Sequence, residues 1–368
     1  MGAFTAGRTA DGRIRTAQII GNAALGGVAA CALNYYRHAD RSFFCSDFFT
    51  YGPSRLEEEL RAVDPDARVF YLPPLDRRFW QAVPRLTKLL KEGGYALVHS
   101  HMTTLSAFAL YAAKSAGVPV RICHAHSTFD KDSDHYRIKA LLRPFAAKYA
   151  TGLMACGKAA AENLYRGRAE EAYILPNAID LARFSPPRDI KGEAAPPREV
   201  LFVGRFVYQK NLPFLLRAFA RARQQREMRL TLAGDGADRE ALLALSKELK
   251  TESSVRILPP CDPAPLYREA DLFVLPSRYE GLPVVALEAQ AAGLPCLFSD
   301  KIDRDVDVCG NGEFLPLDEE AWAQALNAPR RKSADGAEKL RAAHYDIRTE
   351  GRRLSDYYRE ALAGAGIK

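Results

Sequence analysis

Two glutamates, Glu280 and Glu288, lie in a stretch whose residue types suit a phosphorylated ligand that also carries hydroxyl groups. The loop with Glu280 follows an apolar run at 272–275, and Pro283 then takes the place of a first helical residue, where proline loses no hydrogen bond. Free N–H groups at a helix start attract anions. Carboxylates beside such a site suit sugar hydroxyls. We expect both glutamates to face one ligand, although Glu288 alone could be a solvated helix residue.

Two cations, Arg205 and Lys210, follow another apolar run at 199–203. Gly204, directly before Arg205, permits close approach of the backbone to a ligand. Two cations at a strand end suit a diphosphate, because both form charge-assisted hydrogen bonds with phosphate oxygens. Taken singly, each could be an ordinary surface charge. Together with the glutamates, and at strand ends, they predict one anion site.

Four histidines form two H-x-H pairs, His99 with His101 and His124 with His126. Each pair ends an apolar run, and residues two apart on a strand share a face, so four imidazoles could converge on a metal ion. No cysteine or acidic residue lies at ligand spacing with them. We therefore expect no metal at this cluster, and no cofactor elsewhere.

Short β-branched runs alternate with longer amphipathic stretches, which predicts parallel sheets covered by helices on both faces. Strands are expected at 16–21, 69–72, 96–99, 118–123, 152–155, 172–175, 199–203, 229–233, 255–258, 272–275 and 295–298. Helices are expected at 55–63, 79–92, 104–116, 212–225, 238–249 and 283–292. A proline-rich stretch at 185–198 separates two halves, and each half is typical of a doubly wound α/β domain.

Composition sets wider limits. The 368 residues include 48% hydrophobic and 26% charged residues, which predicts packed domains rather than disorder. The net charge of +7 permits an anionic partner without selecting one. Seven scattered cysteines without a C-x-x-C pair indicate a reducing cytosol, and no apolar run is long enough to span a bilayer. Arginines followed by the apolar stretch 19–33 imitate a signal peptide, but we favour a strand, loop and helix there.

The chain from Arg13 onward resembles the retaining glycosyltransferases of family four, which have the GT-B fold. The resemblance is carried in the C-terminal half by the Glu-x7-Glu pair, VGRFVYQKN (203–211), LAGDG (232–236) and DLFVLPSRYEGLPVVALEAQAAGLP (271–295). ILPNAIDLARF (174–184) is similar to the family's domain junction, and GNAALGGVAA (21–30), ALVHSHM (96–102) and GVPVRICHAHST (117–128) match more loosely. SDKIDRDVDVCGNGEFLPLDEE (299–320) is similar to the branch that builds bacterial exopolysaccharide or capsule.

The resemblance implies two Rossmann-like domains that face a central cleft. It implies an N-terminal acceptor-side domain at 1–190, a nucleotide-sugar domain at 191–345, and a C-terminal helix at 346–368 that packs back toward the N-terminal domain. It also implies a hexosyltransferase-type enzyme that moves a sugar from a nucleotide-sugar to a saccharide acceptor, with retention of configuration and without a metal. We expect the nucleotide-sugar to be a UDP-sugar.

The resemblance also implies residue roles. Arg205 and Lys210 would hold the donor diphosphate, and Gly204 and Gly27 would let their loops approach it. Glu288 would accept hydrogen bonds from the ribose. Glu280, with the backbone N–H groups of Gly281 and Leu282 nearby, would contact the transferred sugar. His126 would touch that sugar from the other domain, with His124 as its rival. Ala29 replaces an acidic residue that relatives often carry, which leaves acceptor handling there open.

The segment 135–149 mixes basic and large apolar residues, which permits contact with an anionic membrane; the alternative is a helix whose charges are solvated. We expect a cytoplasmic enzyme at the inner face of the membrane that uses a lipid-linked acceptor. Three alternatives remain: an epimerase of the same fold, a non-catalytic nucleotide-sugar-binding protein, and a nucleic-acid binder. The last is disfavoured because basic and aromatic residues do not interleave on one face. A dinucleotide oxidoreductase is disfavoured because 21–27 lacks G-x-G-x-x-G.

Overall fold

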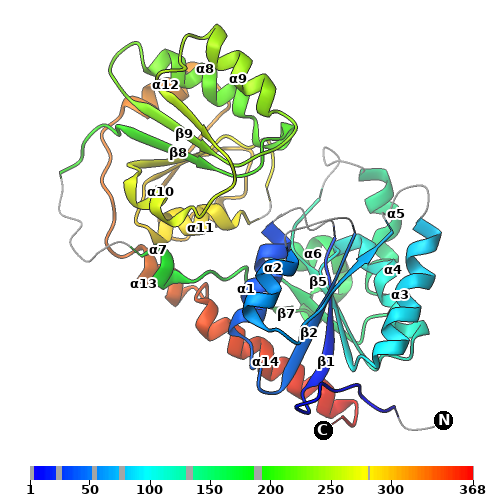
Figure 1. Cartoon of the computed structure of the whole chain (residues 1–368). Helices are drawn as coiled ribbons and strands as arrows, with labels where there is room; N and C mark the ends of the chain where they lie inside the picture. Colours follow the sequence, from blue (N-terminus) through cyan, green and yellow to red (C-terminus); the bar gives the residue numbers. More distant parts are fainter. Residues whose placement is uncertain are drawn as a thin grey trace. The chain divides into compact units, whose positions relative to one another are not determined.

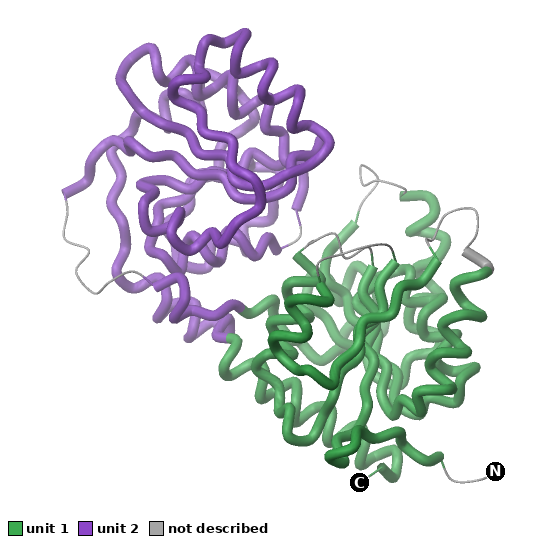
Figure 2. The backbone as a smooth tube through the Cα atoms, viewed as in Figure 1, with its two compact units in different colours: residues 1–178, 347–368 green, residues 179–346 purple. Residues whose placement is uncertain are grey.

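A computed structural model describes residues 4–21, 27–51, 56–73, 79–129, 136–185, 193–280 and 282–367. The chain divides into two compact units (Figure 2). Unit 1 comprises residues 1–178 and 347–368, and unit 2 comprises residues 179–346. All seven cysteines are free.

The first boundary lies earlier than the predicted 190/191. Ile179, Leu181 and Phe184 belong to the hydrophobic core of unit 2, so the segment that precedes the proline-rich stretch already packs with the second unit. The prediction took the proline content of 185–198 as the boundary, whereas burial of these apolar side chains decides it. The second boundary lies at 346/347, and the C-terminal residues 347–368 return to unit 1.

Unit 1 is built on a parallel sheet with the strand order β3-β2-β1-β4-β5-β6-β7 (Figure 1). Its strands are β1 (Ile14–Ile19), β2 (Phe44–Tyr51), β3 (Val69–Leu72), β4 (Leu97–Ser100), β5 (Val120–Ala125), β6 (Gly152–Ala155) and β7 (Tyr173–Ile174). The central strands are almost wholly buried, because helices cover both faces of the sheet.

The helices of unit 1 separate into two layers. One hydrophobic cluster joins the sheet to α3 (Phe79–Gly93), α4 (Ser106–Ser115) and α6 (Lys158–Tyr165), and α5 (Tyr136–Ala146) packs on α4. On the other face lie α1 (Gly27–His38), α2 (Leu56–Val63) and α14 (Ile347–Gly364). Helix α14 packs along α1, where a Cβ on Gly351 would lie 2.7 Å from the His38 carbonyl oxygen. A glycine is therefore required at this crossing.

Unit 2 repeats the plan with the strand order β10-β9-β8-β11-β12-β13, again all parallel. Its strands are β8 (Glu199–Val203), β9 (Arg229–Ala233), β10 (Val255–Leu258), β11 (Leu272–Leu275), β12 (Cys296–Ser299) and β13 (Gly312–Leu315). Its helices are α7 (Leu181–Phe184), α8 (Leu212–Ala222), α9 (Arg239–Glu248), α10 (Ala264–Glu269), α11 (Val284–Ala291), α12 (Glu319–Asn327) and α13 (Gly336–Ala342).

Both units are doubly wound, as the sequence predicts. The strand order reverses between β1 and β4 in unit 1 and between β8 and β11 in unit 2. In open α/β sheets, ligands bind beyond the carboxyl ends of the strands at such a reversal, because the two connections leave in opposite directions there. The loops after β8 and β11 carry Lys210 and Glu280, and the loop after β4 carries His101.

Candidate functional site

Lys210 and Glu280 form a buried ion pair at the strand reversal of unit 2. The Lys210 Nζ atom lies 2.5 Å from Oε1 of Glu280, and the two side chains are only 10% and 8% exposed. Lys210 ends a short 3-10 turn after β8, while Glu280 lies in the loop between β11 and α11. The structure therefore brings together a predicted phosphate-binding cation and a predicted sugar-binding acid.

Gln209 ties the two loops together around this pair. Its Nε2 atom donates to the carbonyl oxygen of Tyr279 at 2.9 Å and to Oε2 of Glu280 at 3.2 Å. The backbone carbonyl oxygen of Gln209 accepts a hydrogen bond from the Arg278 backbone N–H at 2.9 Å. Both Glu280 carboxylate oxygens are thus held by described side chains, which fixes the orientation of the acid before any ligand arrives.

Arg205 differs from Lys210, because it is exposed and forms no ion pair within the described part of the chain. Its backbone is nevertheless fixed by the neighbouring loop after β9. The Gly204 N–H donates to the Ala233 carbonyl at 3.0 Å, and a Cβ on Gly234 would lie 1.9 Å from the Gly204 carbonyl oxygen. The glycine turn at 234–236 therefore supports the loop that carries Arg205.

Helix α11 begins at Val284, shortly after Glu280 in the sequence. The sequence predicts Pro283 as the first helical residue, whereas in the structure it is the N-cap and the helix begins at Val284. No side chain caps the helix there. The first-turn N–H groups of a helix lack partners within it, and the helix dipole makes that end positive. Leu282 is half-buried against the core, and Gly281 lies outside the described residues.

Glu288 lies one turn further along α11, and its carboxylate contacts Tyr267 rather than Glu280. The Tyr267 hydroxyl donates to Oε2 of Glu288 at 2.9 Å and also lies 3.1 Å from the Val285 carbonyl oxygen. Burial raises the pKa of Glu288 to about 7, and the Tyr267 hydrogen bond opposes this rise. No hydrogen bond joins the two glutamates among the described residues.

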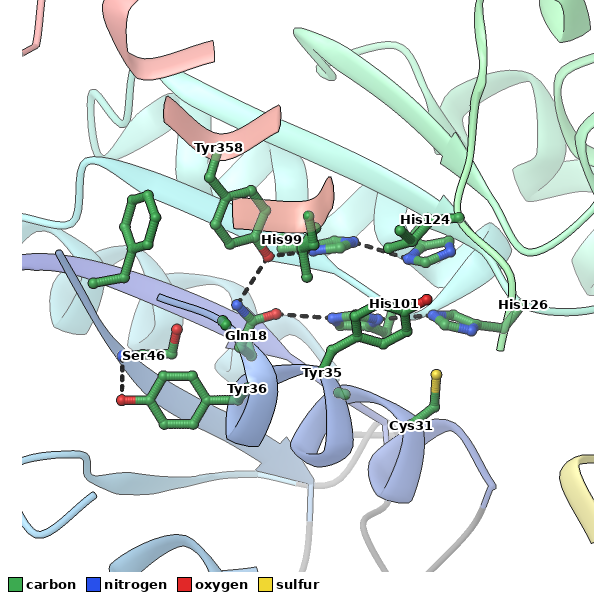
Figure 3. A pocket seen from close by; sticks show the side chains of 15 residues that line it. Gln18, Cys31, Tyr35, Tyr36, Ser46, His99, His101, His124, His126 and Tyr358 are labelled. Carbon is green, nitrogen blue, oxygen red and sulfur yellow. Dashed lines mark hydrogen bonds between the residues drawn. The ribbon is translucent and has the colours of Figure 1, made fainter. Parts of the chain in front are cut away.

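The four histidines of the H-x-H pairs do come together, in a small pocket of unit 1 (Figure 3). His101 and His126 are joined by a 2.8 Å contact between Nδ1 and Nε2, and His99 and His124 by a 3.0 Å contact between Nε2 and Nδ1. The rings also stack, with centroids 4.1 Å apart for His99 and His101. Burial lowers the pKa of all four imidazoles, that of His126 to about 4, so they are neutral at pH 7.

The remaining ring nitrogens of this cluster contact polar side chains from distant segments. His99 Nδ1 lies 2.6 Å from the Tyr358 hydroxyl of α14, and His101 Nε2 lies 2.9 Å from Oε1 of Gln18. His126 Nδ1 lies 3.2 Å from Oδ1 of Asn177. The His124 Nε2 atom is buried and has no hydrogen-bond partner among the described residues.

Three of these histidines, His99, His101 and His124, have donor atoms within 4.8 Å of one another. Stacked rings point their in-plane lone pairs in similar directions, whereas a tetrahedral metal needs lone pairs that converge on one point. The nitrogens are also largely engaged in hydrogen bonds with one another. This geometry favours a hydrogen-bonded network over a metal centre, and the absence of a metal stays a prediction.

The other predicted residues have mixed outcomes. Gly27 begins α1, and a Cβ there would meet nothing within 4 Å, so internal packing does not require glycine; residues 22–26 before it lie outside the described residues. His126 and His124 are both buried, and the choice between them stays open. Ala29 is buried in α1.

Sequence reasoning missed Gln209, Tyr267, Gln18, Asn177 and Tyr358. Gln209 could have been predicted, because it directly precedes Lys210 in the predicted ligand loop. Tyr267 and Tyr358 lie on helices whose sequences carry no signal for a site.

Comparison with known proteins identifies the family of this chain. Residues 25–183 match the family described as Glycosyltransferase Family 4, and residues 197–328 match Glycosyl transferases group 1. The "Putative glycosyltransferase EpsF" of Bacillus subtilis is 35% identical over 82% of this chain and 84% of its own length. The Escherichia coli "UDP-Gal:alpha-D-GlcNAc-diphosphoundecaprenol alpha-1,3-galactosyltransferase" is 28% identical over 65% of this chain and 67% of its own.

Among solved structures, Anabaena Alr3699/HepE in complex with UDP and glucose superposes with a TM-score of 0.77 at 18% identity, over 94% of this chain and 99% of that one. The two doubly wound units agree with the GT-B fold of that class of enzyme. Both halves match glycosyltransferase families, and a relative of more than 30% identity aligns along most of the chain. The chain is therefore a glycosyltransferase of family 4 with the GT-B fold.

Proposed function

We propose that the enzyme transfers a sugar, with retention of configuration, from a UDP-sugar to a lipid-linked saccharide during exopolysaccharide or capsule biosynthesis. The buried pair of Lys210 and Glu280 at the strand reversal of unit 2 carries this proposal. The names of relatives support its finer parts: one uses UDP-Gal and a diphosphoundecaprenol-linked acceptor, and HepE was solved with UDP-glucose.

The donor diphosphate would bind Lys210, Arg205 and the start of α11. Lys210 has three N–H donors, so it can keep one on Glu280 and turn another to a phosphate oxygen. Arg205 is exposed and can reach an incoming anion. The uncapped N-terminus of α11 adds N–H donors and a positive dipole end.

The carboxylates would orient the rest of the donor. Glu280, held by Lys210 and Gln209, accepts hydrogen bonds from hydroxyls of the transferred sugar. The backbone N–H groups of Leu282 and of Gly281, which lies outside the described residues, stay predicted donors. Glu288 accepts hydrogen bonds from the ribose hydroxyls. His126 remains our candidate for a sugar contact contributed by unit 1.

In the reaction, the bond between C1 of the sugar and the bridging phosphate oxygen breaks, and its electron pair leaves with the diphosphate. The acceptor oxygen forms the new bond on the face from which the diphosphate departs. The proton of that hydroxyl passes to a phosphate oxygen of the leaving group. Lys210, Arg205 and the α11 N-terminus stabilise the growing negative charge by preorganised electrostatics.

This scheme assigns the role of a metal to protein cations, so we propose that transfer is metal-independent. Dialysis against EDTA should leave the rate of transfer unchanged, with an undialysed sample as the control. A loss of activity that Mg²⁺, Mn²⁺ or Zn²⁺ restores would contradict this part of the proposal.

An exposed apolar surface on α5 supports contact with a membrane. Ile138, Leu141 and Phe145 are 54%, 70% and 44% exposed and lie on one side of the helix by their spacing. The same helix carries Arg137, Lys139 and Arg143, and Lys148 lies over the Phe145 ring. We propose that this α5 patch binds the anionic surface that presents the acceptor. No helix among the described residues is both long and apolar enough to cross a bilayer.

Product analysis tests the proposed reaction directly. The enzyme is incubated with UDP-galactose or UDP-glucose, with and without a GlcNAc-diphospholipid acceptor, and products are identified by mass spectrometry and NMR. We expect a glycosylated lipid with the anomeric configuration of the donor. An inverted product would contradict retention, an epimerised UDP-sugar formed without acceptor would indicate an epimerase, and binding without turnover would indicate a non-catalytic protein.

A further inference from the structure

An exposed aromatic side chain adjoins the Lys210–Glu280 pair. Tyr208 begins the 3-10 turn that Lys210 ends, and it is 67% exposed. Among the described residues of unit 2, no other large aromatic residue is exposed. Aromatic rings are enriched where proteins contact other molecules, because they offer a large apolar face with few rotatable bonds. The ring of Tyr208, at the carboxyl end of β8, is therefore suited to contact a ligand of this site.

Tyr208 is held in place, which distinguishes it from a single exposed apolar residue of the ordinary kind. The guanidinium carbon of Arg278 lies 4.4 Å from the centroid of the Tyr208 ring, within the range of a cation–π contact. Arg278 also donates from Nη2 to Oδ1 of Asn211 at 2.8 Å, and Asn211 is buried. Tyr208 and Arg278, the stacked pair, thus form an exposed surface that is anchored to the core of unit 2.

Hydrogen bonds place the stacked pair beside Glu280. The Arg278 backbone N–H donates to the backbone carbonyl oxygen of Gln209 at 2.9 Å, and the Gln209 side chain donates to Oε2 of Glu280 at 3.2 Å. Tyr208 lies in the same turn as Lys210, and Arg278 lies in the same loop as Glu280. The two loops that form the ion pair therefore also form the stacked pair.

The stacked pair lies at the sugar end of the proposed donor site rather than at its nucleotide end. In the proposed function, the ribose binds Glu288 and the transferred sugar binds Glu280. Glu288 contacts Tyr267 on α10, whereas the bridge through Gln209 ties the stacked pair to Glu280. A nucleobase extends from the ribose, away from the diphosphate and the sugar. Stacking of the base on Tyr208 is therefore disfavoured.

Retention of configuration restricts what else can lie against Tyr208. In the proposed reaction, the acceptor oxygen attacks from the face that the diphosphate leaves, so the acceptor lies next to the groups that hold the diphosphate. Lys210 is one of these groups, and Tyr208 is in the same 3-10 turn. A pyranose ring presents C–H groups on its faces, and an aromatic ring is a large apolar surface on which they can pack. An acceptor saccharide fits this position.

We propose that the stacked pair is an acceptor subsite, in which the saccharide that receives the sugar packs on the Tyr208 ring. Arg278 is a positioning residue that holds this ring. The proposal rests on the proposed function, because it takes from it the order of ribose, diphosphate and sugar along the site. It goes further in giving unit 2 a part in acceptor recognition, which the resemblance assigns to the N-terminal domain.

Steady-state kinetics of the full chain with UDP-galactose and a GlcNAc-diphospholipid acceptor test the subsite. Tyr208→Ala should raise the KM for the acceptor roughly threefold to tenfold, the effect of losing one aromatic contact. The Kd for UDP, measured by calorimetry, should stay unchanged. Tyr208→Phe keeps the ring and should keep the KM of the parent. Tyr71→Ala, at an exposed tyrosine of β3 in unit 1, is the matched control and should behave as the parent does.

A double variant tests the positioning role of Arg278. Arg278→Ala should raise the KM for the acceptor less than Tyr208→Ala does, and Arg278→Lys, which keeps a cation beside the ring, should recover part of the increase. Because Arg278 acts through the ring, the variant that carries both alanines should have the same KM as Tyr208→Ala alone. A further increase in the double variant would contradict the positioning role and show that Arg278 contacts the acceptor itself.

Two results for Tyr208→Ala would overturn the proposal. A weaker Kd for UDP would place the ring against the nucleotide, and an unchanged KM for the acceptor would show that the ring does not contact the saccharide. Both substituted side chains are exposed, so melting temperatures should match that of the parent. These failures differ from failure of the proposed function. If the parent itself transfers no sugar to this acceptor, the proposed function fails, and the subsite fails with it.

Discussion

Lys210 Nζ and Glu280 Oε1 lie 2.5 Å apart, although 70 residues separate them in the sequence. Each side chain follows one of two neighbouring strands, β8 and β11, at the strand reversal of unit 2. A buried charge pair of this kind is seldom a source of net stability, because desolvation offsets much of the attraction. Stabilisation of the fold is therefore not a sufficient reason for burying these two charges, which agrees with the ligand-binding role that we propose for them.

The two predicted phosphate-binding cations should respond differently to replacement by alanine. Lys210→Ala leaves the buried Glu280 charge unpaired, which should cost about 3–5 kcal/mol of stability as well as activity. Arg205→Ala removes an exposed side chain, so transfer should fall roughly a hundredfold with little change in melting temperature. Steady-state kinetics and thermal unfolding measure both effects, and Arg256→Ala, an exposed arginine on β10, is the matched control.

A double variant separates the two roles of the pair. Lys210→Met with Glu280→Gln removes both charges and should recover most of the stability lost in Lys210→Ala, yet remain inactive. Recovery of activity along with stability would show that the pair has only a structural role.

Glu288 should make donor binding depend on pH. Its pKa is raised to about 7, so the free enzyme holds it protonated below that pH. The ionised form, which we propose accepts hydrogen bonds from the ribose, then becomes scarce. The Kd for UDP should therefore rise by up to about tenfold for each pH unit below about 7. Glu288→Gln should weaken binding and flatten the profile, as measured by calorimetry from pH 5.5 to 8.5.

Tyr267→Phe tests whether the pKa of Glu288 causes this pH dependence of UDP binding. The Tyr267 hydrogen bond lowers the pKa of Glu288, so its removal should shift the same profile to higher pH. A shift to lower pH, or a profile that Glu288→Gln leaves unchanged, would contradict the role given to this acid.

The histidine network should make unit 1 sensitive to acid. The pKa of each of the four imidazoles is lower in the folded chain than the ordinary value of about 6.5, so the unfolded chain binds protons more tightly. The stability contribution is present above pH 6.5 and is lost progressively as pH falls toward the folded values, about 4 for His126. Glu288, in unit 2, has the opposite sign, because its pKa is raised on folding.

Hydrogen exchange read by mass spectrometry can follow the two units separately. Between pH 7 and pH 5, after correction for intrinsic exchange rates, peptides from β4 and β5 should lose protection, and those from β11 should not. His101→Asn should reduce the loss in unit 1. Equal protection of β4 and β5 across this range would show that the imidazoles do not titrate as their burial implies.

The α5 patch should govern binding to anionic vesicles. Leu141→Glu removes its most exposed apolar side chain and adds a negative charge, so sedimentation with phosphatidylglycerol vesicles should decrease several-fold without a change in melting temperature. Leu243→Glu, on an exposed leucine of α9 in unit 2, is the control and should bind as the parent does. Similar losses in both variants, or none in Leu141→Glu, would remove the patch as the membrane contact.

The sequence predicts the doubly wound fold because its strands are short buried apolar runs followed by recognisable ligand loops. It does not predict β2, where Ser46 and Asp47 interrupt an apolar run. Asp47 is fully buried, and Arg15, Arg68 and Tyr95 contact it from three other segments. Only the assembled sheet brings those partners together, so no local sequence pattern predicts this strand. Strand β13 is likewise missed, because its Gly312–Leu315 segment follows a glycine-rich turn at the sheet edge.

The candidate site shows the same division. Lys210, Glu280 and Glu288 are predictable because each lies within a motif of consecutive residues. The contact of Gln18 with Tyr358 joins residues 340 positions apart, so it depends on the return of α14 to unit 1. Sequence also placed both glutamates on one ligand, whereas the structure gives them separate partners, Lys210 and Tyr267.

A crystal structure of the enzyme with UDP-galactose would test the central claim most directly. We expect the diphosphate to contact Lys210 Nζ, the Arg205 guanidinium and the start of α11, with the ribose hydroxyls on Glu288 and the sugar hydroxyls on Glu280. A nucleotide bound elsewhere, or a diphosphate that leaves the Lys210–Glu280 pair untouched, would contradict it.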